Sequence, residues 1–93
     1  MEFNLGEVKE STYFQTSIQY TGSKQISYLE PSCSCMTPRY DKKSNKITLR
    51  YKAGLIDNVT LKKFGHQIIS RYILIHYKDG TTEKISVKGK VIK

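Results

Sequence analysis

Two cysteines, Cys33 and Cys35, and two histidines, His66 and His76, are the side chains best suited to hold a metal ion or to attack a substrate. A structural zinc site typically needs four such ligands, and it separates paired cysteines by two to four residues. Here a single residue separates the cysteines, and the histidines lie far apart in the sequence. We therefore expect two small thiols that pack at one end of the fold, without a metal or cofactor. A cysteine-based metal or redox module is the least favoured alternative.

A catalytic cysteine would also need a base and a group that orients the base. Either histidine could act as that base, but no pattern in the sequence brings one close to Cys33. The carboxylates are few and scattered, without a pair at a spacing typical of acid–base catalysis. A glycine-rich phosphate loop, a nucleophile elbow and a metalloprotease helix are all missing from the sequence. We therefore predict that the protein is not an enzyme.

Basic side chains are the most prominent chemical feature of the chain. Lys and Arg number 16 against 8 Asp and Glu, which gives a formal net charge of +8. Such a charge suits docking on an acidic protein, binding to nucleic acid, or simple solubility. Two groups of basic residues repeat with the period of a strand and are predicted to be interaction candidates: Lys46, Arg50 and Lys52, and Lys84, Lys88 and Lys90.

Proteins that bind single-stranded nucleic acid combine basic residues with exposed aromatic rings on one platform. Tyr51 and Tyr77 fall on the apolar faces of their predicted strands, so the sequence shows no such platform. Any binding to nucleic acid is therefore expected to be weak, independent of base sequence and sensitive to salt.

The elements that must position these side chains are seven predicted strands, most of them with alternating apolar and polar residues. They span residues 3–8, 12–20, 25–30, 36–40, 46–52, 67–78 and 81–91. Asp79-Gly80 predicts a type I′ hairpin, and residues 53–66 lack the alternation, with Asp57-Asn58 able to cap one helical turn there. Short strands with regular turns are typical of an antiparallel β-sandwich, in this case one domain of residues 1–93.

The run 67–78 carries large apolar residues on both faces, which one thin core cannot bury. Its two lines are Ile69, Ile73 and Ile75, and Ile68, Tyr72 and Leu74. Unless residues 53–66 cover it, the outward line forms an apolar patch of the kind that marks an interface. We select Ile73 and Ile75 as interaction candidates, for self-association or for docking on a larger assembly.

Both prolines and both cysteines lie between the predicted strands 25–30 and 36–40. Pro31 has no backbone N–H and cannot continue a strand ladder, so Pro31, Cys33 and Cys35 are expected to form a stiff structural turn. The N-terminus shows no secretory leader, which indicates a reducing cytoplasm. A disulfide is not the default there, and the spacing of the two cysteines is short for one.

The residues around this turn carry a resemblance. The turn resembles the Pro-Ser-Cys-Gly-Cys-Thr signature of a known family, which reads Pro31-Ser32-Cys33-Ser34-Cys35-Met36 in this chain. That family is a large bacterial and phage family of immunoglobulin-like domains of unknown function. It is similar to the ASH, MSP and hydin-type sandwiches. Residues 3–8, 18–22 and 85–91 resemble three of its strands, whereas Ser34 replaces the usual Gly and Met36 the usual Thr. The resemblance implies an immunoglobulin-like sandwich in which 46–52 and 81–91 belong to opposite sheets, so that the basic charge is spread.

The resemblance carries little about activity, because a fold does not imply a function. A lone basic domain without a secretory leader resembles a small virion protein of a tailed phage. We therefore expect a structural or interaction module, such as a capsid decoration protein, that docks on a larger protein assembly in the host cytoplasm. No run approaches the length of a membrane span, so a membrane partner is not expected. The alternative is a basic accessory protein that binds nucleic acid.

Overall fold

The computed structural model describes residues Met1 to Lys93 and contains seven strands and one short helix. In chain order these are β1 (Glu2–Lys9), β2 (Tyr13–Gln19), β3 (Ile26–Pro31), β4 (Met36–Asp41), β5 (Lys46–Lys52), α1 (Asn58–Phe64), β6 (His66–Tyr77) and β7 (Thr82–Ile92). Every strand coincides closely with a run that was predicted from the sequence, and most of these runs alternate because successive side chains of a strand point to opposite faces of its sheet. The prediction of an all-β fold is confirmed.

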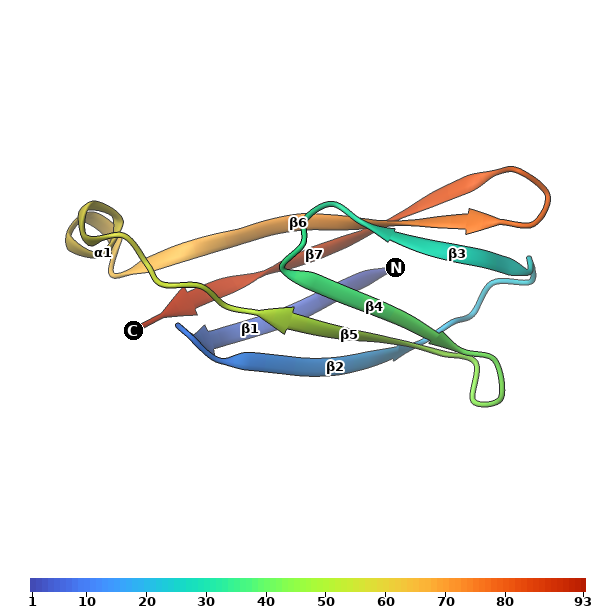
Figure 1. Cartoon of the computed structure of the whole chain (residues 1–93), viewed down its shortest axis with the longest axis horizontal. Coiled ribbons are helices and arrows are strands. Elements are labelled where there is room, and N and C mark those ends of the chain that lie inside the picture. The colour runs from blue at the N-terminus through green and yellow to red at the C-terminus, as the bar shows by residue number, and fades with distance from the viewer.

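The strands form two sheets, one with the order β1-β7-β6-β3 and one with the order β2-β5-β4. Figure 1 shows that the β6–β7 hairpin runs along the molecule, with its turn at one end and α1 at the other. Neighbouring strands are antiparallel except β1 and β7, which are parallel. The expectation of a wholly antiparallel fold was wrong, because the first strand pairs with the last strand and no local hairpin sets its direction.

The core lies between the two sheets and contains 17 buried residues, all of them hydrophobic. The largest fully enclosed side chains come from both sheets: Phe3, Ile47, Leu49, Ile73, Ile75, Ile85 and Val87. Tyr77 is another of these 17 buried residues, and its phenol O–H donates a hydrogen bond to Glu83 Oε1 at 2.9 Å. Burial, together with the neighbouring Tyr20 and Glu83 side chains, raises the pKa of Tyr77 well above its ordinary value of 10.

The edge strand β1 approaches β7 unusually closely at two glycines. Gly6 has φ +63° and lies where the β1–β7 register shifts, between Asn4 and Glu7. A side chain at Gly89 would place its Cβ 2.9 Å from the Gly6 carbonyl oxygen and 3.0 Å from Leu5 Cβ. The β1–β7 pairing therefore depends on the absence of a side chain at Gly89.

The connections agree with the sequence in position and differ in detail. Asp57 is the N-cap of α1 and accepts a hydrogen bond from the Thr60 N–H at 2.9 Å, and the helix is longer than the single turn that we expected. In the β6–β7 turn, Gly80 has φ +88° but Asp79 does not have a positive φ. The expected type I′ turn is therefore corrected, because that type needs a positive φ at both central residues.

Candidate functional site

The outer face of the four-stranded sheet brings the second apolar line of β6 beside the lysines of β7. In the β6–β7 register, Ile68 lies opposite Lys90 and Leu74 lies opposite Lys84. Because β6 and β7 both alternate, these side chains share the face that points away from the core. This surface is termed the apolar–lysine face and consists of Ile68, Tyr72, Leu74, Lys84, Lys88 and Lys90.

The apolar–lysine face is open to solvent. Ile68 is 60% exposed and Tyr72 is 39% exposed, so neither the helix nor the 53–57 segment covers them. The Lys84 Nζ lies 4.7 Å from the centroid of the Tyr72 ring, which places a cation over an aromatic face. The two ion pairs of the molecule join Lys24 to Asp79 and Glu30 to His76, so none of the three lysines has a carboxylate partner.

Two residues of β3 and one of β6 border this face. The rings of Tyr28 and His76 stack with their centroids 4.2 Å apart and their planes 7° from parallel. His76 Nε2 also lies 2.8 Å from Glu30 Oε1. We did not predict Tyr28, which is 56% exposed, as a surface residue of interest. An aromatic pair and a single carboxylate therefore form the border of the apolar–lysine face on the β3 side.

Ile73 and Ile75, which we selected from the sequence as interaction candidates, point the other way. Both are 0% exposed and lie in the core between the two sheets. Their selection is therefore corrected, because a side chain without exposed surface offers nothing to a partner of the folded domain. The exposed line of the same strand begins at Ile68 and includes Tyr72.

The outer face of the three-stranded sheet carries the other predicted basic group. Lys46, Arg50 and Lys52 are all exposed on β5, in the sheet opposite Lys84, Lys88 and Lys90. The Arg50 guanidinium lies 4.3 Å from the centroid of the Tyr13 ring. A depression of about 250 Å³ on this face has a wholly polar lining: Gln15, Thr37, Arg39, Thr48 and Arg50. This surface is thus basic and polar, in contrast to the apolar–lysine face.

Two exposed aromatic rings lie next to basic side chains, although the sequence predicted no such pairing. Tyr51 and Tyr77 are buried, as predicted from their strand faces. Tyr13 and Tyr72, however, are exposed and each lies under a cation, on different sheets. The period-two pattern could have indicated Tyr13, because it shares a face with Gln15 and not with the apolar residues of β2.

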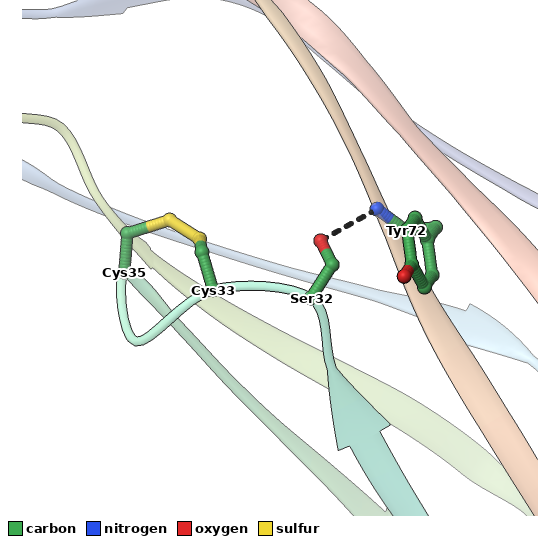
Figure 2. The surroundings of a disulfide bond; sticks show 4 residues. All are labelled: Ser32, Cys33, Cys35 and Tyr72. Carbon is green, nitrogen blue, oxygen red and sulfur yellow. Dashed lines mark hydrogen bonds between the residues drawn. A yellow bond between two sulfur atoms is a disulfide. The ribbon is translucent and has the colours of Figure 1, made fainter.

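The cysteine turn connects β3 of one sheet to β4 of the other. Figure 2 shows a disulfide between Cys33 and Cys35, and beside it a hydrogen bond from the Tyr72 N–H to Ser32 Oγ, 3.1 Å long. The Ser32 N–H in turn donates to the Tyr72 carbonyl oxygen at 3.0 Å. The turn is therefore fastened to β6 immediately before the first cysteine.

The disulfide corrects our expectation of two free thiols. The Cα atoms of Cys33 and Cys35 are 5.3 Å apart, within the range that a disulfide spans. The stiff turn itself was predicted, and Pro31 is the last residue of β3. Ser34 does not have a positive φ, so the replacement of the family's usual Gly costs no backbone strain.

The histidines lie at opposite ends of β6, with His66 its first residue and His76 next to its last. No group of three or more His, Cys, Asp and Glu side chains is placed to hold a metal ion. No helix of the structure is long and apolar enough to span a lipid bilayer. Three surfaces carry the exposed or reactive groups described above: the two outer sheet faces and the cysteine turn.

Comparison with known proteins finds no match among protein-family models, curated proteins or solved structures. Function therefore has to be argued from the chemistry of these surfaces. Of the three, the apolar–lysine face exposes two large hydrophobic side chains of one strand, Ile68 and Tyr72, rimmed by lysines without carboxylate partners, and an apolar patch with a polar rim is the pattern that marks an interaction site.

Proposed function

We propose that this protein is a non-enzymatic interaction module that docks through its apolar–lysine face on an acidic protein surface of a larger assembly. The observation that carries the proposal is the exposure of Ile68 and Tyr72 beside three lysines without carboxylate partners. Burying these apolar side chains would supply affinity, and the ammonium groups would select a partner surface rich in Asp and Glu.

The strand order supports an immunoglobulin-like sandwich as the scaffold. If β2 to β7 are taken as strands B to G of that fold, one sheet contains B, E and D, and the other contains C, F and G. The first strand departs from the constant-type arrangement, because β1 pairs with β7 and not with β2. This agreement and the Pro31–Met36 signature are the support for membership of the immunoglobulin-like family proposed from the sequence.

The assembly that we propose is a virion, in which the chain serves as a capsid decoration protein or another accessory protein. The support is the family resemblance and the net charge of +8, which suits an acidic shell. Many copies on a repeating shell would bind by avidity, so each contact can be weak.

Zero-length carbodiimide coupling tests the orientation of docking. The reagent joins a lysine amine to a carboxylate only where the two are in contact. With the assembly purified from its source, we expect couplings from Lys84, Lys88 and Lys90 to partner Asp or Glu. Lys42 and Lys43, exposed in the β4–β5 turn, serve as the control and should remain uncoupled. Coupling confined to the turn lysines would refute docking through the apolar–lysine face.

A matched pair of substitutions tests the apolar part of the same face. Ile68→Asp and Val59→Asp each place a carboxylate at an exposed apolar residue, since Ile68 is 60% and Val59 is 66% exposed. Ile68→Asp should reduce co-sedimentation with the assembly roughly tenfold or more, as loss of a central interface residue does. Val59→Asp, on α1, should change co-sedimentation with the assembly by less than about twofold. Equal behaviour of the two variants would contradict the proposal, and couplings between two copies of the chain would identify self-association instead.

A further inference from the structure

The Cys33–Cys35 disulfide does little to hold the domain together. It closes a loop of only three residues and joins no two strands that are distant in the sequence. The chain is already fixed on both sides of it. Ser32 forms two hydrogen bonds with Tyr72 on β6, and the Lys52 N–H donates to the Cys35 carbonyl oxygen at 2.8 Å. These three hydrogen bonds do not involve either sulfur, so the disulfide can open while the turn stays in place.

The disulfide is also accessible from one side. Both cysteines are half-buried. Cys35 lines two surface depressions, of about 450 and 280 Å³, whereas Cys33 lines neither. An external thiol can therefore approach Cys35 but not Cys33 through these openings. Attack on Cys35 would release Cys33 as the leaving group.

The surroundings of Cys35 are cationic. Lys52 lines both depressions, Arg50 lines the smaller one and Arg71 the larger one, and no Asp or Glu lines either. None of these three cations belongs to an ion pair of the molecule. Nearby cations favour a thiolate over a thiol, and this is the setting in which reactive cysteines are found.

We propose that Cys33 and Cys35 form a thiol–disulfide exchange site that reacts with thiol compounds while the domain remains folded. An incoming thiolate attacks Cys35 Sγ, the Cys33–Cys35 bond breaks, and its electron pair leaves on Cys33 Sγ as a thiolate. A second thiolate, from the same dithiol or from another glutathione molecule, then attacks the reductant's sulfur in the mixed disulfide and releases Cys35 as a thiolate. The reductant is oxidised to a disulfide and the protein pair gains two electrons, with protons taken from water as the pH requires.

In the reverse direction Cys35 is the nucleophile and Cys33 is the resolving thiol. This assignment follows from the accessibility of Cys35 and from the cations beside it. Two of its cations, Arg50 and Lys52, lie on the three-stranded sheet and not on the apolar–lysine face, whereas Ile68 of that face lines the larger depression. Thiol reactivity of the isolated domain is measured without a docking partner, so failure of the exchange proposal and failure of the docking proposal are distinguishable. Glutathione and a protein dithiol can both carry out this exchange. The rates at which they reduce the native protein show which of the two is the preferred reductant.

Equilibration of the full chain with reduced and oxidised glutathione tests the proposal. The thiol content is fixed by rapid alkylation and counted by mass spectrometry, while circular dichroism reports the fold. We expect complete reduction at millimolar reduced glutathione with an unchanged spectrum. A disulfide that persists under these conditions, or one that is lost only together with the fold, would overturn the proposal.

Charge variants then test the role assigned to the cations. Arg50→Gln with Lys52→Gln should slow alkylation of reduced Cys35 at pH 7 by about three- to tenfold, because the thiolate loses its cationic neighbours. Lys46→Gln is the matched control on the same strand and should change the rate by less than about twofold. Lys52→Arg keeps the charge and should preserve the rate. A rate that is unaffected by the double substitution would refute the electrostatic assignment. A thioredoxin-type dithiol that reacts far faster than glutathione would identify a protein partner.

Discussion

The two faces of β6 can be separated by placing the same charge on adjacent residues, Ile73 and Leu74. Ile73 is 0% exposed and pairs with Ile85 of β7, whereas Leu74 is half-buried and pairs with Lys84. Ile73→Lys removes a buried side chain and leaves an ammonium group in an apolar core, which together cost at least about 4 kcal/mol. That is a large part of the roughly 5–15 kcal/mol by which a domain is stable.

Leu74→Lys should cost about 1 kcal/mol, because the new side chain can extend into solvent. For a domain of this size, each kcal/mol changes the Tm by about 4–8 °C. We therefore expect Ile73→Lys to lower the Tm by roughly 16–32 °C, and Leu74→Lys by roughly 4–8 °C.

Urea unfolding followed by circular dichroism measures both free energies, and Leu74→Gln controls for the loss of apolar surface without a charge. Leu74→Lys should remain folded but fail to join the assembly, since it lies on the apolar–lysine face. If Leu74→Lys unfolds the domain as completely as Ile73→Lys does, the outer face of β6 is covered in solution. A greater loss for Leu74→Lys than for Ile73→Lys would mean that the strand register is shifted by one residue, because such a shift exchanges the two faces.

Four further predictions concern separate features. Gly89→Ala should cost about 1–3 kcal/mol in urea unfolding, since its Cβ would lie 2.9 Å from the Gly6 carbonyl oxygen; an unchanged stability would show that β1 moves away freely. Because the pKa of Tyr77 is raised in the folded state, its contribution to stability is complete below about pH 10 and is lost as the pH rises further. Tyr77→Phe should therefore weaken the loss of stability in alkali, and an identical alkaline profile would contradict the burial of this phenol. Cys33→Ser with Cys35→Ser should destabilise the domain by about 1.6 kcal/mol, the loop-closure value for three residues, and a loss above about 3 kcal/mol would assign the bond a structural role. Binding to single-stranded DNA should fall roughly tenfold or more from 50 to 200 mM salt without base preference; tight, selective binding at physiological salt would favour the nucleic-acid alternative.

The candidate site could be predicted only in part. The basic residues of β5 and β7 were found, because a charged side chain on an alternating strand almost always faces solvent. Ile73 and Ile75 were assigned to the wrong face. Both lines of the strand are apolar, so the pattern shows which residues share a face but not which face is inside.

The sequence also could not predict whether the two cysteines of the turn bond or which side chains surround them. A stiff turn was predicted from Pro31, because proline lacks the backbone N–H that an interior strand position needs. In the structure Pro31 is the last residue of β3 and still pairs with Ile73, a position where its missing N–H is tolerated. Whether Cys33 and Cys35 bond depends on the path of the chain between the two sheets, which brings their Cα atoms to 5.3 Å. The cations beside Cys35 come from β5 and β6, two strands that are distant from the turn in the sequence.

The amino-acid sequence by itself determined the seven strands, to within one residue at each end, and the cap at Asp57, because these depend on alternation, turn residues and caps within a few positions of each other. It indicated only one helical turn there, and not the full length of α1. Only the tertiary structure decided that β1 runs parallel to β7, that Ile68 and Tyr72 remain exposed, and that Cys35 lies among cations. Each of these is a contact between distant parts of the chain. Local periodicity carries no information about which strands become neighbours, and the side of a strand that is buried is set by the sheet that packs against it.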